Sequence, residues 1–279
     1  MESPLTLMAV HAHPDDEAST TGGILARYAA EGVRTVLVTC TNGELGDAPG
    51  GIKPGDPAHD EAAVAASRRG ELAESCRLLG VQHLEMLGYH DSGMAGWEGN
   101  NAPGAFATLR VEDAAAPLVA LIRRYQPQVV VTYDEYGFYG HPDHIQANRI
   151  TQAALQAGGS AARLFYPAIR RSRLATFRDR MIEMGLEPPP IDETRMGVPD
   201  EAIAATLDCH EYAATKRAAL SAHGSQEENL FFLRLDANAF VEMFGREEFT
   251  LARGTVPDPR PVDDLFAGLR ESVGADTRA

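Results

Sequence analysis

Short apolar runs alternate with longer segments of mixed polarity from the start of the chain. Residues 5–10 have the length and composition of a buried strand, and the run is followed closely by a proline and several carboxylates. Residues 18–32 predict a helix that ends at Gly32, and residues 33–41 predict a second buried strand. A strand–helix–strand unit of this kind is typical of a parallel sheet with right-handed crossovers. The pattern therefore predicts an α/β fold.

The same alternation continues through the rest of the chain. Helices are predicted at residues 60–79, 111–125, 142–157 and 211–221, and strands at 83–87, 129–133 and 204–207. Aromatic residues at 231–235 and 248–251 are typical of a packed core. Residues 168–200 carry no motif that can be aligned, and residues 255–279 predict a tail or an edge helix. Because nothing obvious divides the chain, we expect a single domain over residues 1–279.

The net charge of the chain limits the classes of partner that we expect. The formal net charge is −15, from 40 acidic and 25 basic residues. Nucleic acids and anionic membrane surfaces would be repelled without a compensating basic patch, so we expect neither as a partner. The main basic run, at residues 170–173, is interpreted as a solvated turn or the start of a helix. A small molecule is the expected partner, and the sequence leaves homo-oligomer formation open.

Cysteine usage and the absence of long apolar runs bear on location. Cys40, Cys76 and Cys209 are too few and too scattered for a disulfide framework or a zinc knuckle, and they fit reduced thiols in a cytosolic protein. The N-terminus lacks a basic region followed by an uninterrupted apolar stretch, and no later run reaches the roughly 20 apolar residues that a membrane span requires. We therefore expect a cytoplasmic protein.

The first candidate for chemistry follows the first predicted strand directly. It is the run from His11 to Glu17, which reads His-Ala-His-Pro-Asp-Asp-Glu. Ligand sites of parallel α/β sheets form at the carboxyl edge of the strands, where the next helix also offers its positive N-terminus. Adjacent carboxylates in such a place repel each other unless a cation or strong hydrogen-bond donors hold them. A metal ion satisfies this requirement most directly.

A second motif follows the strand predicted at 129–133. It runs from Asp134 to His144 and ends in Tyr-Gly-His-Pro-Asp-His. Pro142 suits the first turn of a helix, and His141 and His144, three residues apart, would then lie on one side of its start. The Asp143 carboxylate can orient a neighbouring imidazole by accepting its second N–H. Two His-Pro-Asp sequences, each placed after a buried strand, predict a shared metal site.

The candidate ligands limit the choice of metal. Two imidazoles and one carboxylate, without a thiolate, suit zinc in a catalytic site with an open position, and they also suit iron(II). Zinc is favoured, because a spare carboxylate could take a proton from water while a further His and a Tyr stabilise an oxyanion. Glu44, in a glycine-rich loop after the second strand, could also line the site. Arg68 and Arg69 point about 100° apart on a helix, so at most one of them faces it.

With these residues in view, the chain resembles the LmbE-like, or N-acetylglucosaminylphosphatidylinositol de-N-acetylase (PIG-L), superfamily. The matching stretches are residues 11–17, 41–46, 68–72, 91–94, 139–144, 216–220 and 222–226. The likeness covers about residues 5–253 and is greatest to the branch that handles mycothiol. It implies a Rossmann-like, mostly parallel sheet flanked by helices in a three-layer sandwich. It also implies hydrolysis of an N-acyl group on a glucosamine-type sugar such as N-acetylglucosaminyl-inositol.

The resemblance also implies roles for individual residues. It makes His13, Asp16 and His144 the zinc ligands and Asp15 the general base. It makes a protonated His141, held by Asp143, and Tyr139 the groups that stabilise the oxygen of the tetrahedral intermediate. It makes Arg68 and Asp91 the partners of sugar or inositol hydroxyls, with Met94 and Glu44 nearby.

Other polar residues near the motifs are given supporting roles. His11 and Glu17 fit orienting or packing roles, because three ligands already suffice. His223 could reach the pocket or bond to backbone at a helix end. Asn148 stands where many relatives carry another His, and we assign it no metal role.

Several alternatives remain open. Within the same class, the substrate could be a mycothiol S-conjugate or the sugar of a natural product. A non-catalytic sugar-binding protein on the same fold would have lost the base or a ligand, and here all candidates are present. A metal-dependent oxygenase would be favoured only if iron raised turnover in the presence of oxygen.

Overall fold

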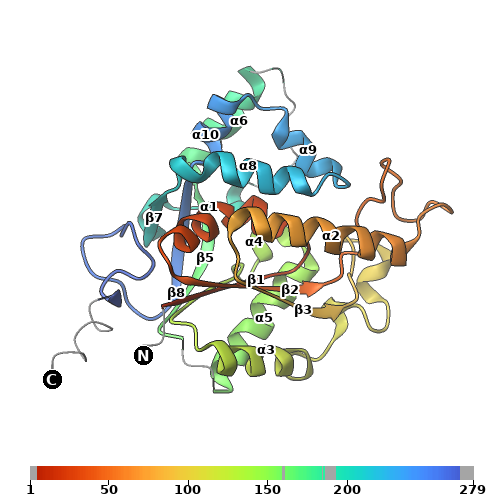
Figure 1. Ribbon diagram of the computed structural model, residues 1–279, viewed down its shortest axis with the longest axis horizontal. Coiled ribbons are helices and arrows are strands. Elements are labelled where there is room, and N and C mark those ends of the chain that lie inside the picture. Colours follow the sequence, from red (N-terminus) through yellow and green to blue (C-terminus); the bar gives the residue numbers. More distant parts are fainter. Residues whose placement is uncertain (1–4, 159–160, 184, 186–192, 271–279) are drawn as a thin grey trace.

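The computed structural model describes residues 5–158, 161–183, 185 and 193–270, and a mixed sheet runs through its centre (Figure 1). The strand order is β3-β2-β1-β4-β5-β8-β7, with β6 paired to β5 outside this path. The strands are β1 (Thr6–His11), β2 (Arg34–Thr41), β3 (His83–Tyr89), β4 (Val129–Val131), β5 (Arg163–Arg170), β6 (Gly197–Val198), β7 (Ala205–Asp208) and β8 (Arg246–Arg253). Strands β1 to β6 pair in parallel, whereas β8 is antiparallel to both β5 and β7. The predicted mostly parallel α/β sheet is confirmed.

Helices cover both faces of this sheet. The α-helices are α1 (Asp16–Ala30), α2 (Glu61–Leu79), α3 (Val111–Tyr125), α4 (Gly137–Gly140), α5 (Pro142–Gln156), α6 (Arg171–Glu183), α7 (Glu193–Met196), α8 (Ala213–Ala222), α9 (Glu227–Leu233) and α10 (Ala237–Phe244). Figure 1 shows α1 and α2 above the sheet, α8 stacked beyond them, and α3 and α5 below. The first two helices thus lie between the sheet and α8.

Strand β1 lies at the centre of two hydrophobic clusters, one on each face of the sheet. All six of its residues are buried. Leu7 and Ala9 belong to one cluster and Met8 and Val10 to the other, as the alternation of side chains along a strand requires. A strand buried on both faces is mostly apolar, which explains the apolar residues 7–10 at the centre of β1, with Thr6 and His11 at its ends.

Local sequence signals define the helix boundaries near the candidate motifs. Asp60 caps α2 by accepting hydrogen bonds from the backbone N–H groups of residues 62 and 63, and Gly80 ends the helix at a φ of 72°. Pro142 occupies the first turn of α5. Helix α1 starts at Asp16, two residues before the predicted start at 18. Carboxylates in a first turn interact favourably with the helix dipole, which explains the earlier start.

The basic run at residues 170–173 is partly solvated, with Arg171 and Ser172 exposed and Arg170 and Arg173 half-buried. Helix α6 does begin at Arg171, as one of the two interpretations proposed. Its neighbours, however, form ion pairs with Glu248 of β8, Arg170 Nε at 2.7 Å and Arg173 Nη1 at 3.6 Å. Glu248 is buried, so the pairing compensates for its loss of hydration. The run therefore secures an internal carboxylate.

The C-terminal region packs against the domain as far as residue 270. Val262, Leu265 and Phe266 are buried, and the Tyr28 hydroxyl donates to Asp264 Oδ1 at 2.8 Å. These turns replace the tail or edge helix expected for 255–279, of which residues 271–279 lie outside the described residues. In the region without an alignable motif, 168–200, residues 184 and 186–192 also lie outside the described residues. The rest of that region supplies the end of β5, α6, α7 and β6.

Two further expectations can be compared with the structure. The three cysteines are buried free thiols. Among the described residues, no helix has both the length and the apolar character needed to cross a membrane.

Candidate metal centre

The two His-Pro-Asp motifs meet at the carboxyl ends of β1 and β4. These strands are parallel neighbours in the sheet, so the loops that follow them emerge side by side. The ring centroid of His13, from the first loop, lies 4.5 Å from that of His141 and 5.3 Å from that of His144. Residues about 130 positions apart in the sequence thus share one buried site.

Three of the predicted ligands approach each other closely. His13 Nδ1 lies 3.3 Å from Asp16 Oδ2, and His144 Nε2 lies 3.4 Å from Asp16 Oδ1. All three residues are buried, with Asp16 the most exposed at 8%. Asp16 Oδ2 also accepts a hydrogen bond of 2.8 Å from the backbone N–H of His13, which holds the carboxylate between the two imidazoles.

The remaining nitrogen of each imidazole is held by a second acceptor. His13 Nε2 donates to Asp143 Oδ2 at 3.2 Å, and His144 Nδ1 donates to the carbonyl oxygen of Gly137 at 3.2 Å. These bonds leave the lone pairs of His13 Nδ1 and His144 Nε2 facing Asp16. Histidine ligands of metals are oriented in this way in proteins. His144 Nε2 is buried and has no hydrogen-bond partner among the described residues, so the arrangement fits a metal ion.

The electrostatics of the cluster also favour a cation. Burial disfavours the protonated form of His13, but Asp91, Asp143 and Asp16 outweigh it and raise its pKa well above the ordinary value. Burial likewise disfavours ionisation of Asp16, yet His144 and His13 hold the pKa of this carboxyl well below its usual range. The carboxylates that attract a proton to His13 also attract a metal cation to this position.

Two other groupings of these residues could hold a metal ion. His13, His141 and His144 each offer one nitrogen within 4.8 Å of the others, and so do single atoms of His13, Asp91 and Asp143. In each grouping one atom of a member already accepts a hydrogen bond, although Asp143 Oδ1 has no hydrogen-bond partner among the described residues. His141 Nδ1 accepts from the backbone N–H of Asp143 at 3.1 Å, and Asp143 Oδ2 accepts from His13. A His/Asp cluster that could hold a metal is therefore present.

Asp15 lies beside this cluster in an unusual backbone conformation. Its φ is 136° and its ψ is −23°, in the left-handed region that non-glycine residues seldom adopt. Its Oδ2 lies 3.1 Å from Arg68 Nη2 and accepts from Asn229 Nδ2 at 3.1 Å. Burial raises the pKa of Asp15 against the opposing effect of Arg68. A carboxylate with a raised pKa suits proton transfer near neutral pH.

The structure corrects the expected relation between His141 and Asp143. The Asp143 carboxylate bonds His13 and the backbone N–H of Ser92, and only its backbone N–H bonds His141. Burial, with His13 and His144 nearby, lowers the pKa of His141 well below the ordinary value. This direction favours the neutral imidazole over the protonated form expected from the sequence. Because Nδ1 is the acceptor, Nε2 carries the proton and remains a hydrogen-bond donor.

Arg68 is engaged with the protein. It is 3% exposed, and its guanidinium donates to the carbonyl oxygens of Gly43 at 2.9 Å and Pro14 at 2.6 Å in addition to its contact with Asp15. A Cβ atom at Gly43 or Gly46 would lie 2.5 Å from Arg68 Nη1, so both glycines make room for this side chain. These bonds engage both terminal nitrogens of the guanidinium, and the expected contact with sugar hydroxyls stays a prediction. Arg69 is exposed, as the helix geometry predicted.

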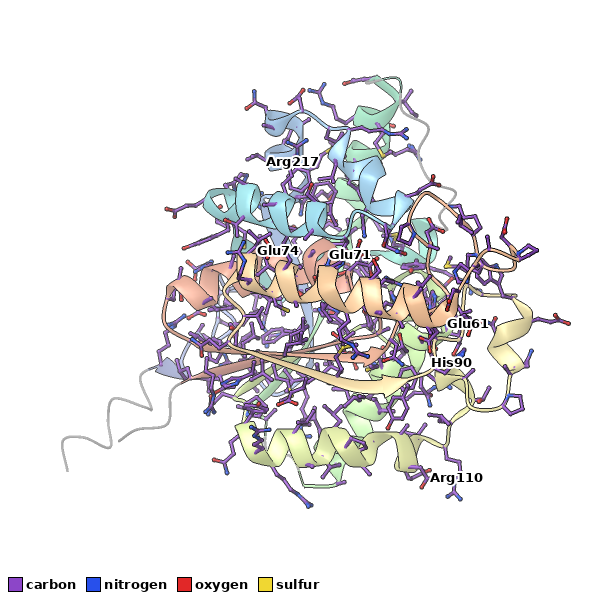
Figure 2. All side chains as sticks on the ribbon, turned by 45° about the vertical axis from the view of Figure 1, so that its right-hand side comes forward. Glu61, Glu71, Glu74, His90, Arg110 and Arg217 are labelled. Carbon is purple, nitrogen blue, oxygen red and sulfur yellow. The ribbon has the colours of Figure 1, made fainter. Side chains whose placement is uncertain are left out.

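The other residues predicted to contact the substrate surround the cluster. Asp91 Oδ1 lies 3.7 Å from His13 Nε2 and accepts from the backbone N–H of residue 93, while Glu44 Oε2 accepts from the backbone N–H of Asp91. Met94 and Tyr139 are exposed at 36% and 39%. The Tyr139 ring lies 6.1 Å from that of His141. Glu44 also lies near His90, which Figure 2 places beside Glu61 at the end of α2.

Several contacts at the site were not predicted from the sequence. Tyr133 stacks on His144, with ring centroids 3.9 Å apart, and its hydroxyl bonds His11. His223 Nε2 bonds Glu17 at 2.7 Å rather than reaching the pocket or a backbone group. Burial opposes charge on this pair, but their mutual attraction raises the pKa of His223 and lowers that of Glu17. The supporting roles expected for His11 and Glu17 agree with these contacts.

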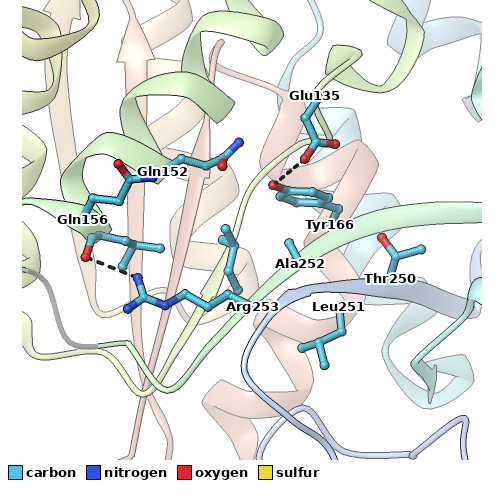
Figure 3. Close-up of a pocket in the computed structure, with 10 residues that line it drawn as sticks. Glu135, Gln152, Gln156, Tyr166, Thr250, Leu251, Ala252 and Arg253 are labelled. Atoms are coloured by element: carbon cyan, nitrogen blue, oxygen red, sulfur yellow. Dashed lines mark hydrogen bonds between the residues drawn. The ribbon is translucent and has the colours of Figure 1, made fainter.

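A separate hollow of about 650 Å³ lies between α5 and strands β5 and β8 (Figure 3). Its polar lining includes Tyr166, whose hydroxyl donates to Glu135 at 3.3 Å, and Arg253, which donates to the carbonyl oxygen of Leu155. None of its described lining residues is His or Cys, and none belongs to the predicted site. The chemistry is therefore assigned to the His/Asp cluster.

Comparisons with known proteins identify the family and the fold. The family model described as GlcNAc-PI de-N-acetylase (PIG-L) matches residues 8–155. A relative from Salinispora arenicola, named 1D-myo-inositol 2-acetamido-2-deoxy-alpha-D-glucopyranoside deacetylase, is 41% identical over 98% of this chain and 94% of its own length. Two solved structures share the fold. N,N'-diacetylchitobiose deacetylase from Pyrococcus horikoshii has a TM-score of 0.57 and 23% identity, covering 89% of this chain and 84% of its own. The 4-carboxy-2-hydroxymuconate hydratase GalB from Pseudomonas putida has a TM-score of 0.61 and 19% identity, covering 91% and 99%.

Proposed function

Because the chain belongs to the GlcNAc-PI de-N-acetylase (PIG-L) family, we propose that it is a zinc-dependent deacetylase of N-acetylglucosaminyl-inositol. The hydrolysis of an amide bond on a sugar is supported by the family and by the names of relatives at about 40% identity. The fold alone would not support it, since a hydratase shares the same fold. The observation that carries the proposal is the convergence of His13 Nδ1, Asp16 and His144 Nε2.

These three residues are the ones we assign to zinc. Two imidazoles and one carboxylate leave an open coordination position, and the donor set contains no thiolate. The buried Nε2 of His144, which has no hydrogen-bond partner among the described residues and faces the Asp16 carboxylate, is the strongest single indication that a ligand belongs here. When bound, zinc supplies a Lewis acid that polarises the amide carbonyl and lowers the pKa of water. Iron(II) fits the same donors, so both metals belong in the test.

Asp15 is assigned as the general base. Both of its described side-chain contacts, to Arg68 and Asn229, are made by Oδ2. Oδ1 is therefore the atom we expect to take a proton from the attacking water and later pass it to the leaving amine. In this proposal Arg68 holds the base.

His141 is assigned to the negative oxygen of the tetrahedral intermediate. The backbone N–H of Asp143 occupies Nδ1, so a neutral His141 can donate from Nε2 without an added proton. The exposed Tyr139 is assigned to the same oxygen. Asp91 and Glu44 are assigned to substrate hydroxyls, with Met94 against an apolar face of the substrate.

The function is tested by measuring free amine released from a panel of substrates. The protein is stripped with a chelator, reloaded with zinc or, without oxygen, with iron(II), and given N-acetylglucosaminyl-inositol, N,N'-diacetylchitobiose or a mycothiol conjugate. We expect fastest release from the inositol glycoside, loss of activity after stripping, and recovery with metal independent of oxygen. Release that persists without metal, or no release from any amide, would overturn the proposal.

A further inference from the structure

The backbone conformation of Asp15 has to be held in place. A non-glycine residue in the left-handed region is strained and persists only where the surrounding structure holds it there. The backbone N–H of Asp15 donates to Glu17 Oε2 at 3.0 Å. This bond joins the backbone of Asp15 to a side chain only two residues later, and it fixes the orientation of the peptide group that precedes Asp15. The position of the Asp15 carboxylate therefore depends on where the Glu17 carboxylate lies.

Glu17 is itself fixed by two other elements. It is fully buried, and its Oε1 accepts from the Ser75 hydroxyl of α2 at 2.5 Å and from His223 Nε2 at 2.7 Å. An ionised carboxylate at this depth requires such donors. Of the two, only His223 can carry a charge that balances it.

His223 makes one described side-chain hydrogen bond, and that bond goes to Glu17. The ring is completely buried at the C-terminal end of α8, and its Nδ1 has no hydrogen-bond partner among the described residues. A histidine retained only to satisfy the fold would ordinarily have both nitrogens bonded. The described side-chain hydrogen bond of His223 therefore goes to the Glu17 carboxylate, which in turn bonds the backbone of Asp15.

The segment that follows His223 is anchored on the same side of the site. Ser225 bonds Glu71 of α2, labelled in Figure 2, through its backbone N–H at 2.9 Å and its hydroxyl at 2.8 Å. Asn229 then donates to the Asp15 carboxylate itself. Residues 223–229 therefore contact the proposed base from two directions, through Glu17 at its backbone and through Asn229 at its side chain.

We infer that His223 is a positioning residue that acts through Glu17 to hold the Asp15 backbone where its carboxylate meets the reacting water. This inference rests on the proposed function, because it takes Asp15 to be the base. His223 does not touch the reacting atoms. It affects the rate only through the placement of Asp15.

The test compares His223→Leu with His223→Gln. Leucine has a similar volume but no donor, whereas the glutamine amide can still donate toward Glu17. We expect His223→Leu to lower kcat by about 10- to 100-fold, the usual effect of a displaced catalytic group, with KM and bound zinc unchanged. His223→Gln should recover most of the loss. Ser75→Ala, which removes the other side-chain donor without opening a large cavity, should lower kcat by a smaller factor.

Lys216→Met is the matched control. Lys216 lies on the same helix, is buried, and forms an ion pair of 2.6 Å with the buried Glu247, which in turn accepts from backbone N–H groups of α1. No described contact joins this pair to Asp15. Lys216→Met should therefore lower the melting temperature while kcat stays near wild type.

The outcomes separate the inference from the proposed function. If wild-type protein loaded with zinc releases no amine, the proposed function fails. If the wild type is active and His223→Leu keeps its kcat, or if Lys216→Met loses kcat to the same extent, only the inference fails. Should His223→Leu not fold, an unchanged kcat in Ser75→Ala contradicts the inference and a lowered one supports it.

Discussion

Replacing Asp143 by Asn distinguishes two accounts of the centre. The sequence suggests that the Asp143 carboxylate orients His141, whereas in the structure it accepts from His13 Nε2 and from the backbone N–H of Ser92. The hydrogen bond to His141 comes from the backbone N–H of Asp143, which the substitution leaves intact. Asp143→Asn therefore perturbs a proposed metal ligand and spares the proposed oxyanion donor.

The size of the effect follows from what the carboxylate does. Asp143 is fully buried and contributes a charge-assisted bond that keeps the proton of His13 on Nε2 and the lone pair on Nδ1. Removal of an outer partner of a metal-bound histidine typically weakens metal binding by 10- to 100-fold, or about 1.4–2.7 kcal/mol. We expect a loss in that range for zinc.

Zinc affinity is measured by competition with a chromophoric chelator at fixed pH, and kcat is measured at saturating zinc. We expect Asp143→Asn to weaken zinc binding by about 10- to 100-fold while the folded fraction stays unchanged. At saturating zinc much of the activity should return. Unchanged zinc affinity with a kcat that stays low would show that the carboxylate serves His141, and would refute the reasoning.

Four further predictions use the same site. Asp15→Asn should keep zinc bound but lower kcat by about 100- to 10,000-fold, the usual cost of losing a general base; near-normal turnover would remove Asp15 from that role. His144→Ala should lose zinc in elemental analysis, whereas His210→Ala, which changes an exposed imidazole paired with Asp208, should retain it. His141→Ala should lower kcat with little change in KM, because an oxyanion donor acts in the transition state; a change confined to KM would contradict this. Burial lowers the pKa of His11 to about 4 from 6.5, so its share of stability is complete above pH 6.5 and is lost as pH falls toward 4. In metal-free protein this contribution to the free energy of unfolding is about 3 kcal/mol. The free energy of unfolding of His11→Gln, measured by chemical denaturation, should therefore change less between pH 6.5 and pH 4 than that of the wild type. An identical pH dependence in the two proteins would contradict the contribution assigned to His11.

The parts of the fold that the sequence predicted correctly are those determined locally. Residues 7–10 are apolar because β1 is buried on both faces, and Gly80 and Pro142 mark helix ends through their own backbone preferences. Strand β5 was missed because residues 163–170 contain arginines and a proline. Arg163 is buried there because its guanidinium donates to the carbonyl oxygens of three residues near the C-terminus. Nothing in the local pattern indicates these distant acceptors.

The same distinction applies to the site. The two motifs could be placed together because each directly follows a strand, and parallel strands end at one edge. Which imidazole the Asp143 carboxylate would meet could not be predicted, since His13 is 130 residues away and His141 only two. Asn229 and His223, more than 200 residues from their partners, gave no local signal of their contacts with Asp15 and Glu17. Spacing along the chain fixes neighbours on one element and says little about partners on another.

A zinc-loaded crystal measured at the zinc absorption edge tests the central claim most directly. We predict a single anomalous peak within bonding distance of His13 Nδ1, an Asp16 carboxylate oxygen and His144 Nε2, with the Asp15 carboxylate beside its open position. A peak held instead by Asp91 and Asp143, or no peak in this cluster in protein that releases amine, would contradict the account.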